Sequence, residues 1–159
     1  MPFDLQRSSD WVRRWGLFLT ALGTVIWAGC SNPDRPDQDA DAGREVLAEG
    51  RFEGRESMST RGRYRIERGE GHLILLLQED FQTDAGPDLH LVLSPALADT
   101  VAGKTALPEG ALIVDSLRKQ TGSQRYLLSD SIALNHYQSV LIHCVKFSHL
   151  YGAAPIDMR

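Results

Sequence analysis

Cys144 carries the side chain best suited to redox chemistry in the C-terminal half of the sequence. The chain has two cysteines, and the other, Cys30, follows an apolar N-terminal run, which leaves Cys144 without an intramolecular disulfide partner. A lone thiol can cycle through a sulfenic acid or a mixed disulfide if solvent reaches it and positive charge stabilises its thiolate. His143 and His149 are close enough in the sequence to supply that charge. Cys144 is therefore the candidate redox thiol.

The same thiol also has a structural interpretation. Alternation with period two places Cys144 on one face of a predicted strand with Val140 and Ile142, which indicates a core position. A buried cysteine behaves as a small hydrophobe. A free thiol in an oxidising compartment is unusual unless it is shielded or used. Both interpretations therefore stay open.

A third interpretation makes Cys144 a ligand to haem or copper. With His90, His149 and Met158 it forms a set that loosely resembles the ligands of blue-copper sites. The spacing between Cys144 and Met158 is long for such a set, however. The sequence therefore requires no cofactor, and haem and copper remain secondary alternatives.

Asp88 and His90 stand two residues apart, so they lie on one face of a predicted strand. The carboxylate can orient the imidazole, either for general base catalysis or to support a metal ligand. It can equally fix the turn that follows Gly86 and Pro87. We favour the structural role, and we keep these two residues, with His143 and His149, as candidate binding residues.

Charge and motif content exclude several functional classes. The formal net charge is −4, and a mildly acidic chain without a basic stripe is a poor candidate for nucleic-acid binding. No serine stands in a nucleophile-elbow context, and neither a glycine-rich phosphate loop nor a metal-spaced histidine pair occurs. The sequence thus favours a non-enzymatic protein over a hydrolase or kinase. One further charged stretch alternates with glutamate and predicts the solvated face of the first strands: Arg51, Arg55, Arg61, Arg63, Arg65 and Arg68.

Short strands must position these residues. Several apolar segments of strand length are separated by Gly, Pro and Asp at intervals of about 8–12 residues, which predicts an all-β fold, an antiparallel sandwich or barrel. Residues 72–78 form a continuous apolar run that predicts a strand buried on both faces, and residues 139–147, largely apolar on both faces, form the strongest β segment. Helical turns are expected only near residues 94–102 and 135–137. The remaining strands are predicted over residues 63–67, 89–93, 111–117, 126–128 and 150–151, with the third and fourth joined through the turn at Gly122 and Ser123.

The N-terminal segment predicts export. Arg13 and Arg14 precede an apolar run over residues 15–27, whose 13 residues are too few for a spanning helix of about 20. Small residues then lead into Cys30, as in a signal peptide that ends in a lipobox. Trp27 stands where such motifs usually carry leucine. The two arginines also allow export by the twin-arginine route.

We therefore expect a signal peptide over residues 1–29 and acylation of Cys30, which would make the mature protein a lipoprotein facing the periplasm or the cell surface. Ser31, which follows the anchor, resembles the default that directs Gram-negative lipoproteins to the outer membrane. Residues 30–49 are rich in Asp and Pro and predict a flexible linker. One domain, over residues 50–159, then follows.

The domain contains an ordered set of sequence blocks that cover about residues 50–155: Phe81, residues 86–94 (GPDLHLVLS), 122–126 (GSQRY), 137–148 (YQSVLIHCVKFS) and 151–154 (YGAA). In these blocks it resembles the DM thirteen family, a small extracytoplasmic module found alone in bacterial lipoproteins and beside DOMON-type domains in animals. The resemblance implies electron transfer centred on Cys144. His143 departs from the family pattern, because an aromatic residue, commonly Trp, is expected before the cysteine.

Two functional hypotheses follow from this resemblance. The first is a redox or electron-transfer accessory domain of a cell-envelope lipoprotein, centred on Cys144 and acting with an envelope redox partner. The second is a non-catalytic binding module that docks an envelope protein or small ligand through the Asp88–His90 loop, with Cys144 as a structural residue.

Overall fold

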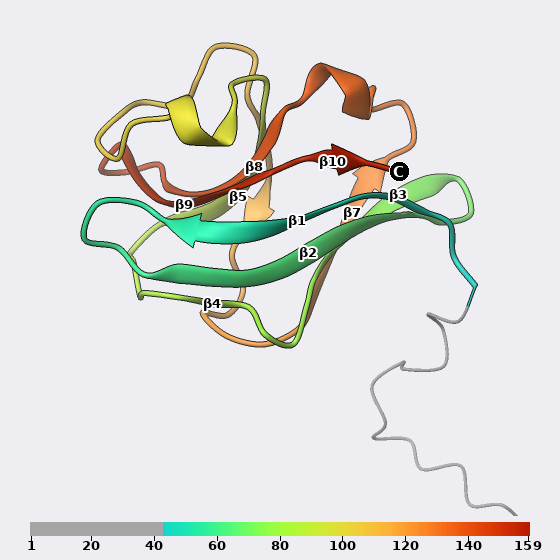
Figure 1. Ribbon diagram of the computed structural model, residues 1–159, viewed down its shortest axis with the longest axis horizontal. Helices are drawn as coiled ribbons and strands as arrows, with labels where there is room; N and C mark the ends of the chain where they lie inside the picture. Colours follow the sequence, from blue (N-terminus) through green and yellow to red (C-terminus); the bar gives the residue numbers. More distant parts are fainter. Residues whose placement is uncertain (1–42) are drawn as a thin grey trace, which may run out of the picture. The chain divides into compact units, whose positions relative to one another are not determined.

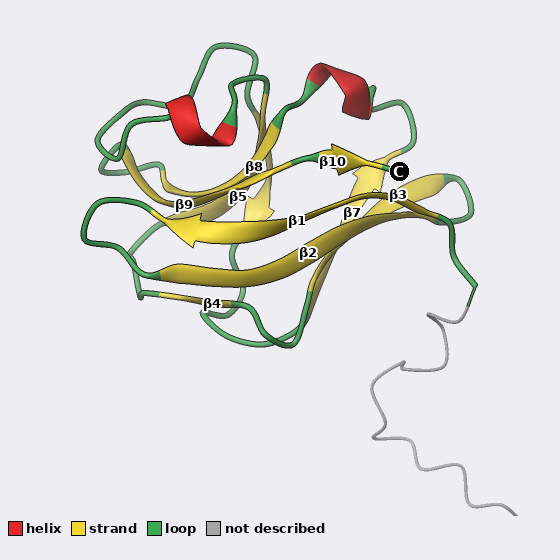
Figure 2. Ribbon diagram, in the orientation of Figure 1, coloured by secondary structure: helices red, strands yellow, loops and turns green. Residues whose placement is uncertain are grey.

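The computed structural model describes residues 43–159 (Figure 1). Nearly all of this part consists of strands and connecting loops, with two single-turn 3₁₀ helices (Figure 2). The elements in chain order are β1 (Val46–Gly54), β2 (Thr60–Arg68), β3 (His72–Leu77), β4 (Gln82–Thr83), β5 (Leu89–Ser94), η2 (Ala98–Thr100), β6 (Leu112–Ser116), β7 (Gln124–Ser129), η3 (Leu134–His136), β8 (Ser139–Cys144), β9 (His149–Pro155) and β10 (Asp157–Met158).

The strands form one antiparallel sheet in the order β6-β5-β8-β9-β1-β2-β3-β7. The short strand β10 pairs with β1, and β4 pairs with β2. The sheet curls until its two end strands approach each other: after β6, the amide of Arg118 donates to the hydroxyl of Tyr126 on β7 at 3.2 Å. The predicted all-β barrel or sandwich is confirmed, as a nearly closed antiparallel barrel.

The main core fills the inside of this barrel. Alternate residues of each strand point inward, and the centre is an aromatic cluster in which Phe52 contacts Tyr64 and Phe81 with ring centroids 5.6 and 5.5 Å apart. Aliphatic side chains from β3, β5 and β8 complete it. Cys144 belongs to this core. The inward-facing set therefore places the candidate redox thiol in an apolar interior.

A second, smaller apolar cluster covers the outer face of β5, β8 and β9. Val92, Leu141 and Leu150 form it, and the loop over residues 95–111 packs across it. The amide of Leu150 donates to the carbonyl of Gly103 at 2.7 Å, which fixes the loop to β9. Every residue of β8 is consequently buried. The continuous apolar run predicted for this strand reflects burial on both faces.

Two expectations about element bounds need correction. β1 begins at Val46, inside the segment expected to be linker, because Ala48 is fully buried there. The strand predicted over residues 139–147 ends at Cys144, since residues 145–148 form the turn to β9. β6 and β7 are joined through Gly122 as expected, and they pair with β5 and β3 respectively.

Residues 1–42 lie outside the described part of the chain. The predicted signal peptide, the lipidation site at Cys30 and most of the expected linker fall there. Within residues 43–159, no helix has the length and apolar character needed to cross a membrane.

Candidate functional site

Cys144 is the last residue of β8, and its side chain is 1% exposed. It lies between Leu89 on β5 and His149 on β9, which are its partners in the antiparallel register. It is the one cysteine of residues 43–159 and carries a free thiol. No hydrogen bond to its sulfur forms within that part of the chain. The thiol thus sits in an apolar site at the end of a strand, one residue from a surface turn.

Tyr151 on β9 lies beside this thiol. Burial raises the pKa of its hydroxyl, and the nearby Cys144 and Asp84 raise it further, so the phenol stays protonated. The hydroxyl packs against the loop before β5: a methyl group added at Gly86 would come within 2.9 Å of the Tyr151 oxygen. A larger residue at Gly86 would therefore crowd both Leu89 and Tyr151.

His149 begins β9 directly opposite Cys144. Its ring meets that of Tyr151 edge-on, with centroids 5.6 Å apart. Its Nε2 atom lies 3.8 Å from a carboxylate oxygen of Glu56, close enough for an ion pair when the ring is protonated. Of the candidate histidines, His149 is thus the one that can bring positive charge to the side of the thiol.

Asp88 connects the start of β5 to the turn after β8. One carboxylate oxygen accepts a hydrogen bond from His90 Nε2 at 2.9 Å, and the other accepts from the amide of Lys146 at 3.0 Å. Its backbone carbonyl accepts from the amide of Val145 at 3.1 Å. The hydrogen bond from His90 is the main reason why the pKa of Asp88 lies below its usual value. These contacts support the structural role expected for the Asp88–His90 pair.

His143 lies on the opposite face of β8 from Cys144, beneath the loop over residues 95–111. Its Nε2 donates to the carbonyl of Thr105 at 2.9 Å. Burial lowers its pKa; the Thr105 hydrogen bond acts in the other direction, and the charges of His149 and His90 lower it further. His143 is therefore held neutral and points away from the thiol, because neighbours on a strand face opposite sides. The expectation that it supplies charge to Cys144 finds no support in this geometry.

The expected copper ligands are not brought together. Met158 on β10 pairs with Ala48 near the start of β1, whereas β9 reaches the other end of β1 at Glu53 and Gly54. No group of three or more His, Cys, Asp or Glu within residues 43–159 is arranged to hold a metal ion.

The arrangement places a lone thiol beside a phenol and an imidazole. Sequence reasoning identified Cys144 and His149 but missed Tyr151. The signal for Tyr151 was available, because period-two alternation from His149 places it on the same inner face of β9. A thiol in this setting can exchange with a disulfide if the neighbouring turn admits one.

Comparison with protein families matches residues 51–156 to the family described as Electron transfer DM13. The match extends from β1 to the residue before β10, and it contains Asp88, His90, Cys144, His149 and Tyr151. Searches of curated proteins and of solved structures find no match. Since the matched residues make up most of the chain, it belongs to the electron transfer DM13 family.

Proposed function

We propose that this chain is a cell-envelope lipoprotein whose DM13 domain is an accessory module for electron transfer, with Cys144 as its redox group. The observation that carries the proposal is the position of the thiol. Cys144 is the one cysteine of the family-matched region, and Tyr151 and His149 flank it at the end of β8.

The chemistry that fits a lone thiol is exchange with a disulfide of a partner protein. The Cys144 thiolate attacks one sulfur of that disulfide, the bond between the two partner sulfurs breaks, and the second sulfur leaves as a thiolate. A dithiol of a second partner then attacks the Cys144 sulfur, so that the first partner leaves fully reduced and a new mixed disulfide forms. The second thiol of that pair attacks its neighbouring sulfur, closes the second partner's disulfide and releases the Cys144 thiolate. Two electrons thus pass from the dithiol of one partner to the disulfide of the other, and no cofactor is needed.

Access to the thiol depends on the turn over residues 145–148. Three hydrogen bonds hold this turn: the two from Val145 and Lys146 to Asp88, and one from the amide of Ser148 to the carbonyl of Val145 at 3.3 Å. Ser148 adopts a φ of 48°, a conformation that is costly for a residue with a side chain. A short, strained turn held by few bonds opens more readily than the strands around it. We infer that a partner disulfide reaches Cys144 when this turn opens.

The test uses the full chain with Cys30→Ser, which leaves Cys144 as the sole thiol. The native protein is titrated with a disulfide reagent and then equilibrated in glutathione buffers of stepped potential, with Cys144→Ala as the control. We expect complete reaction without denaturant and a mixed disulfide that forms reversibly with potential. A thiol that reacts only in denaturant would refute the redox role.

That refuting outcome would favour the second candidate function, a binding module with a structural Cys144. The observation in its favour is the 1% exposure of a thiol packed in the main core. In that case Cys144→Ala would lower stability without changing function, while substitution of Asp88 or His90 would abolish binding.

The envelope location rests on the sequence of the N-terminal segment. It is tested by mass spectrometry of the mature protein from a bacterial host. Acylation at Cys30 and loss of residues 1–29 are expected, and Cys30→Ser should give an unacylated form that is released from membranes. An unmodified Cys30 in the native chain would overturn the lipoprotein assignment.

A further inference from the structure

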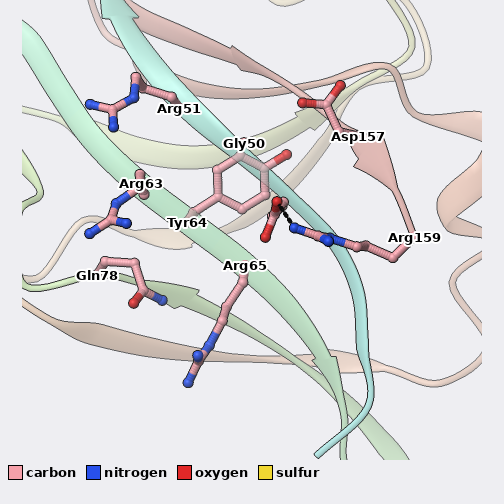
Figure 3. Close-up of a pocket in the computed structure, with 9 residues that line it drawn as sticks. Gly50, Arg51, Arg63, Tyr64, Arg65, Gln78, Asp157 and Arg159 are labelled. Atoms are coloured by element: carbon pink, nitrogen blue, oxygen red, sulfur yellow. Dashed lines mark hydrogen bonds and ion pairs between the residues drawn. The ribbon is translucent and has the colours of Figure 1, made fainter.

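A polar groove whose lining does not include Cys144 lies on the outer face of the barrel (Figure 3). It has a volume of about 520 Å³, within the range of small-molecule sites. Strands β1, β2 and β10 and the residue after β3 form its walls. Among its lining residues are Arg51, Arg63, Arg65, Gln78 and Arg159.

Two arginines face each other at one end of the groove. Arg51 on β1 and Arg63 on β2 are direct partners in the antiparallel register, and in Figure 3 both lie on the side of Tyr64 away from Asp157 and Arg159. Like charges directly opposite each other destabilise a sheet. Because the two arginines face an open groove, an anion bound between them would replace this repulsion with a favourable contact.

The protein neutralises this pair only in part. Asp80 accepts hydrogen bonds from the backbone amide and Nε of Arg63, at 3.0 and 2.9 Å. The terminal nitrogens of Arg63 remain without a hydrogen bond in the described part of the chain. Arg51 makes neither a hydrogen bond nor a close ion pair with any of residues 43–159. Both guanidinium groups can therefore donate to a ligand.

The other end of the groove has the opposite charge. Glu49 on β1 and Asp157 on β10 are direct partners there, and Arg159 binds Glu49 (Figure 3). Between the two ends, the hydroxyl of Tyr64 donates to the carbonyl of Pro155 at 2.7 Å and is thus already used. Because carboxylates line this end and arginines line the other, an anion would bind at the end formed by Arg51 and Arg63.

Gln78 adds a third donor beside Arg63. Its backbone amide donates to the carbonyl of Arg63 at 2.9 Å, which keeps the two residues adjacent. Its side-chain Nε2 is buried and has no acceptor among residues 43–159. A rotation of the terminal amide turns this donor into the groove, where a ligand oxygen would satisfy it.

We propose that the groove binds a phosphomonoester, with the phosphate between Arg51 and Arg63 and an oxygen accepting from Gln78. Paired guanidinium forks suit a tetrahedral dianion, because each can donate two hydrogen bonds to phosphate oxygens. The groove is longer than a phosphate group, so the remainder holds the organic part of the ester. That part comes either from a soluble metabolite or from a lipid headgroup.

The experiment measures binding by calorimetry on the full chain with Cys30→Ser. One arm uses glycerol 3-phosphate, and the other uses vesicles of phosphatidic acid in phosphatidylcholine. Arg51→Gln is the test variant, since it removes an arginine that no carboxylate of the described chain contacts. Arg68→Gln is the matched control, because Arg68 is an exposed arginine at the end of the neighbouring strand β2 that pairs with Glu45 outside the groove.

We expect Arg51→Gln to weaken binding about tenfold, the loss of one or two charge-assisted hydrogen bonds. Arg68→Gln should leave it unchanged. An effect seen only with glycerol 3-phosphate identifies a soluble ester, and one seen only with vesicles identifies a lipid headgroup. Equal losses in both variants would show unspecific charge attraction and overturn the site, as would the absence of binding in both arms.

Discussion

His90 on β5 and His143 on β8 lie directly opposite one another in adjacent antiparallel strands. The Nδ1 atom of each ring is buried and has no hydrogen-bond partner within residues 43–159. A proton added to His143 would therefore enter a dry site next to a second imidazole. Both effects favour the neutral ring, which makes the folded state sensitive to mild acid.

The first prediction concerns this acid sensitivity. The pKa of His143 lies below 6.5, its usual value, mainly because of burial. Below that pH the unfolded chain binds a proton at this residue that the folded chain does not bind. The contribution of neutral His143 to the unfolding free energy is therefore complete above pH 6.5 and decreases as the pH falls. His143→Gln keeps a donor for Thr105 but has no titrating ring. It should lose less stability than the parent between about pH 8 and pH 5, as measured by urea denaturation.

His136→Gln is the matched control for this prediction. His136 is exposed at the end of η3, and its side chain forms no hydrogen bond or ion pair within residues 43–159. Its replacement should leave the acid-dependent loss as in the parent. If His143→Gln showed the same loss as His136→Gln, another group would be responsible for it.

The second prediction compares two replacements of Cys144. Cys144→Ser is nearly isosteric but buries a hydroxyl where the described chain supplies no partner for the sulfur, which should cost about 1–3 kcal/mol of unfolding free energy. Cys144→Ala leaves a small cavity and should cost about 1 kcal/mol. Urea denaturation of both proteins gives the comparison. A serine variant as stable as the parent would mean that water reaches this position in the folded state.

The third prediction concerns access to the thiol. Asp88→Ala removes the carboxylate that accepts from the Lys146 amide and from His90. Losing a hydrogen bond to a charged group should make opening of the turn easier by about 1.5 kcal/mol, so labelling of Cys144 should become about tenfold faster. Stopped-flow thiol labelling measures the rate. Asp130→Ala, at an exposed position of a different loop, should label at the parent's rate; equal acceleration in both would remove Asp88 from control of access.

Local patterning predicted most of the strands but few of their partners. Period-two alternation identified β2 and β5, and continuous apolar runs identified β3 and β8, because these patterns report which faces are buried. The Gly122 turn joins β6 to β7, yet barrel closure sends them to opposite ends of the strand order. Pairing of that kind is a property of the whole sheet, which no local window contains.

The sequence likewise predicted only part of the candidate site. Strand parity correctly placed Cys144 inward, and the spacing of Asp88 and His90 correctly placed them in contact. The sequence did not show that His143 is buried and held neutral, because the loop over residues 95–111 that covers it has no strand pattern. No strand was predicted at β1, because its first residues fall in the Asp- and Pro-rich segment expected to be linker, although Ala48 and Phe52 face the core.

The last prediction tests a glycine that the barrel requires. Gly62 on β2 adopts a φ of 108°, and a Cβ there would lie 2.4 Å from the Cα of Phe81. Gly62→Ala must therefore distort the backbone and displace a core aromatic residue, with an expected loss of about 2–4 kcal/mol. Gly71→Ala is the matched control, since Gly71 also has a positive φ, 69°, but nothing lies within 4 Å of its added Cβ. That variant should lose only about 1 kcal/mol, the conformational cost alone. Thermal or urea denaturation separates the two, and equal losses would mean that the β2–Phe81 contact adds nothing beyond backbone strain.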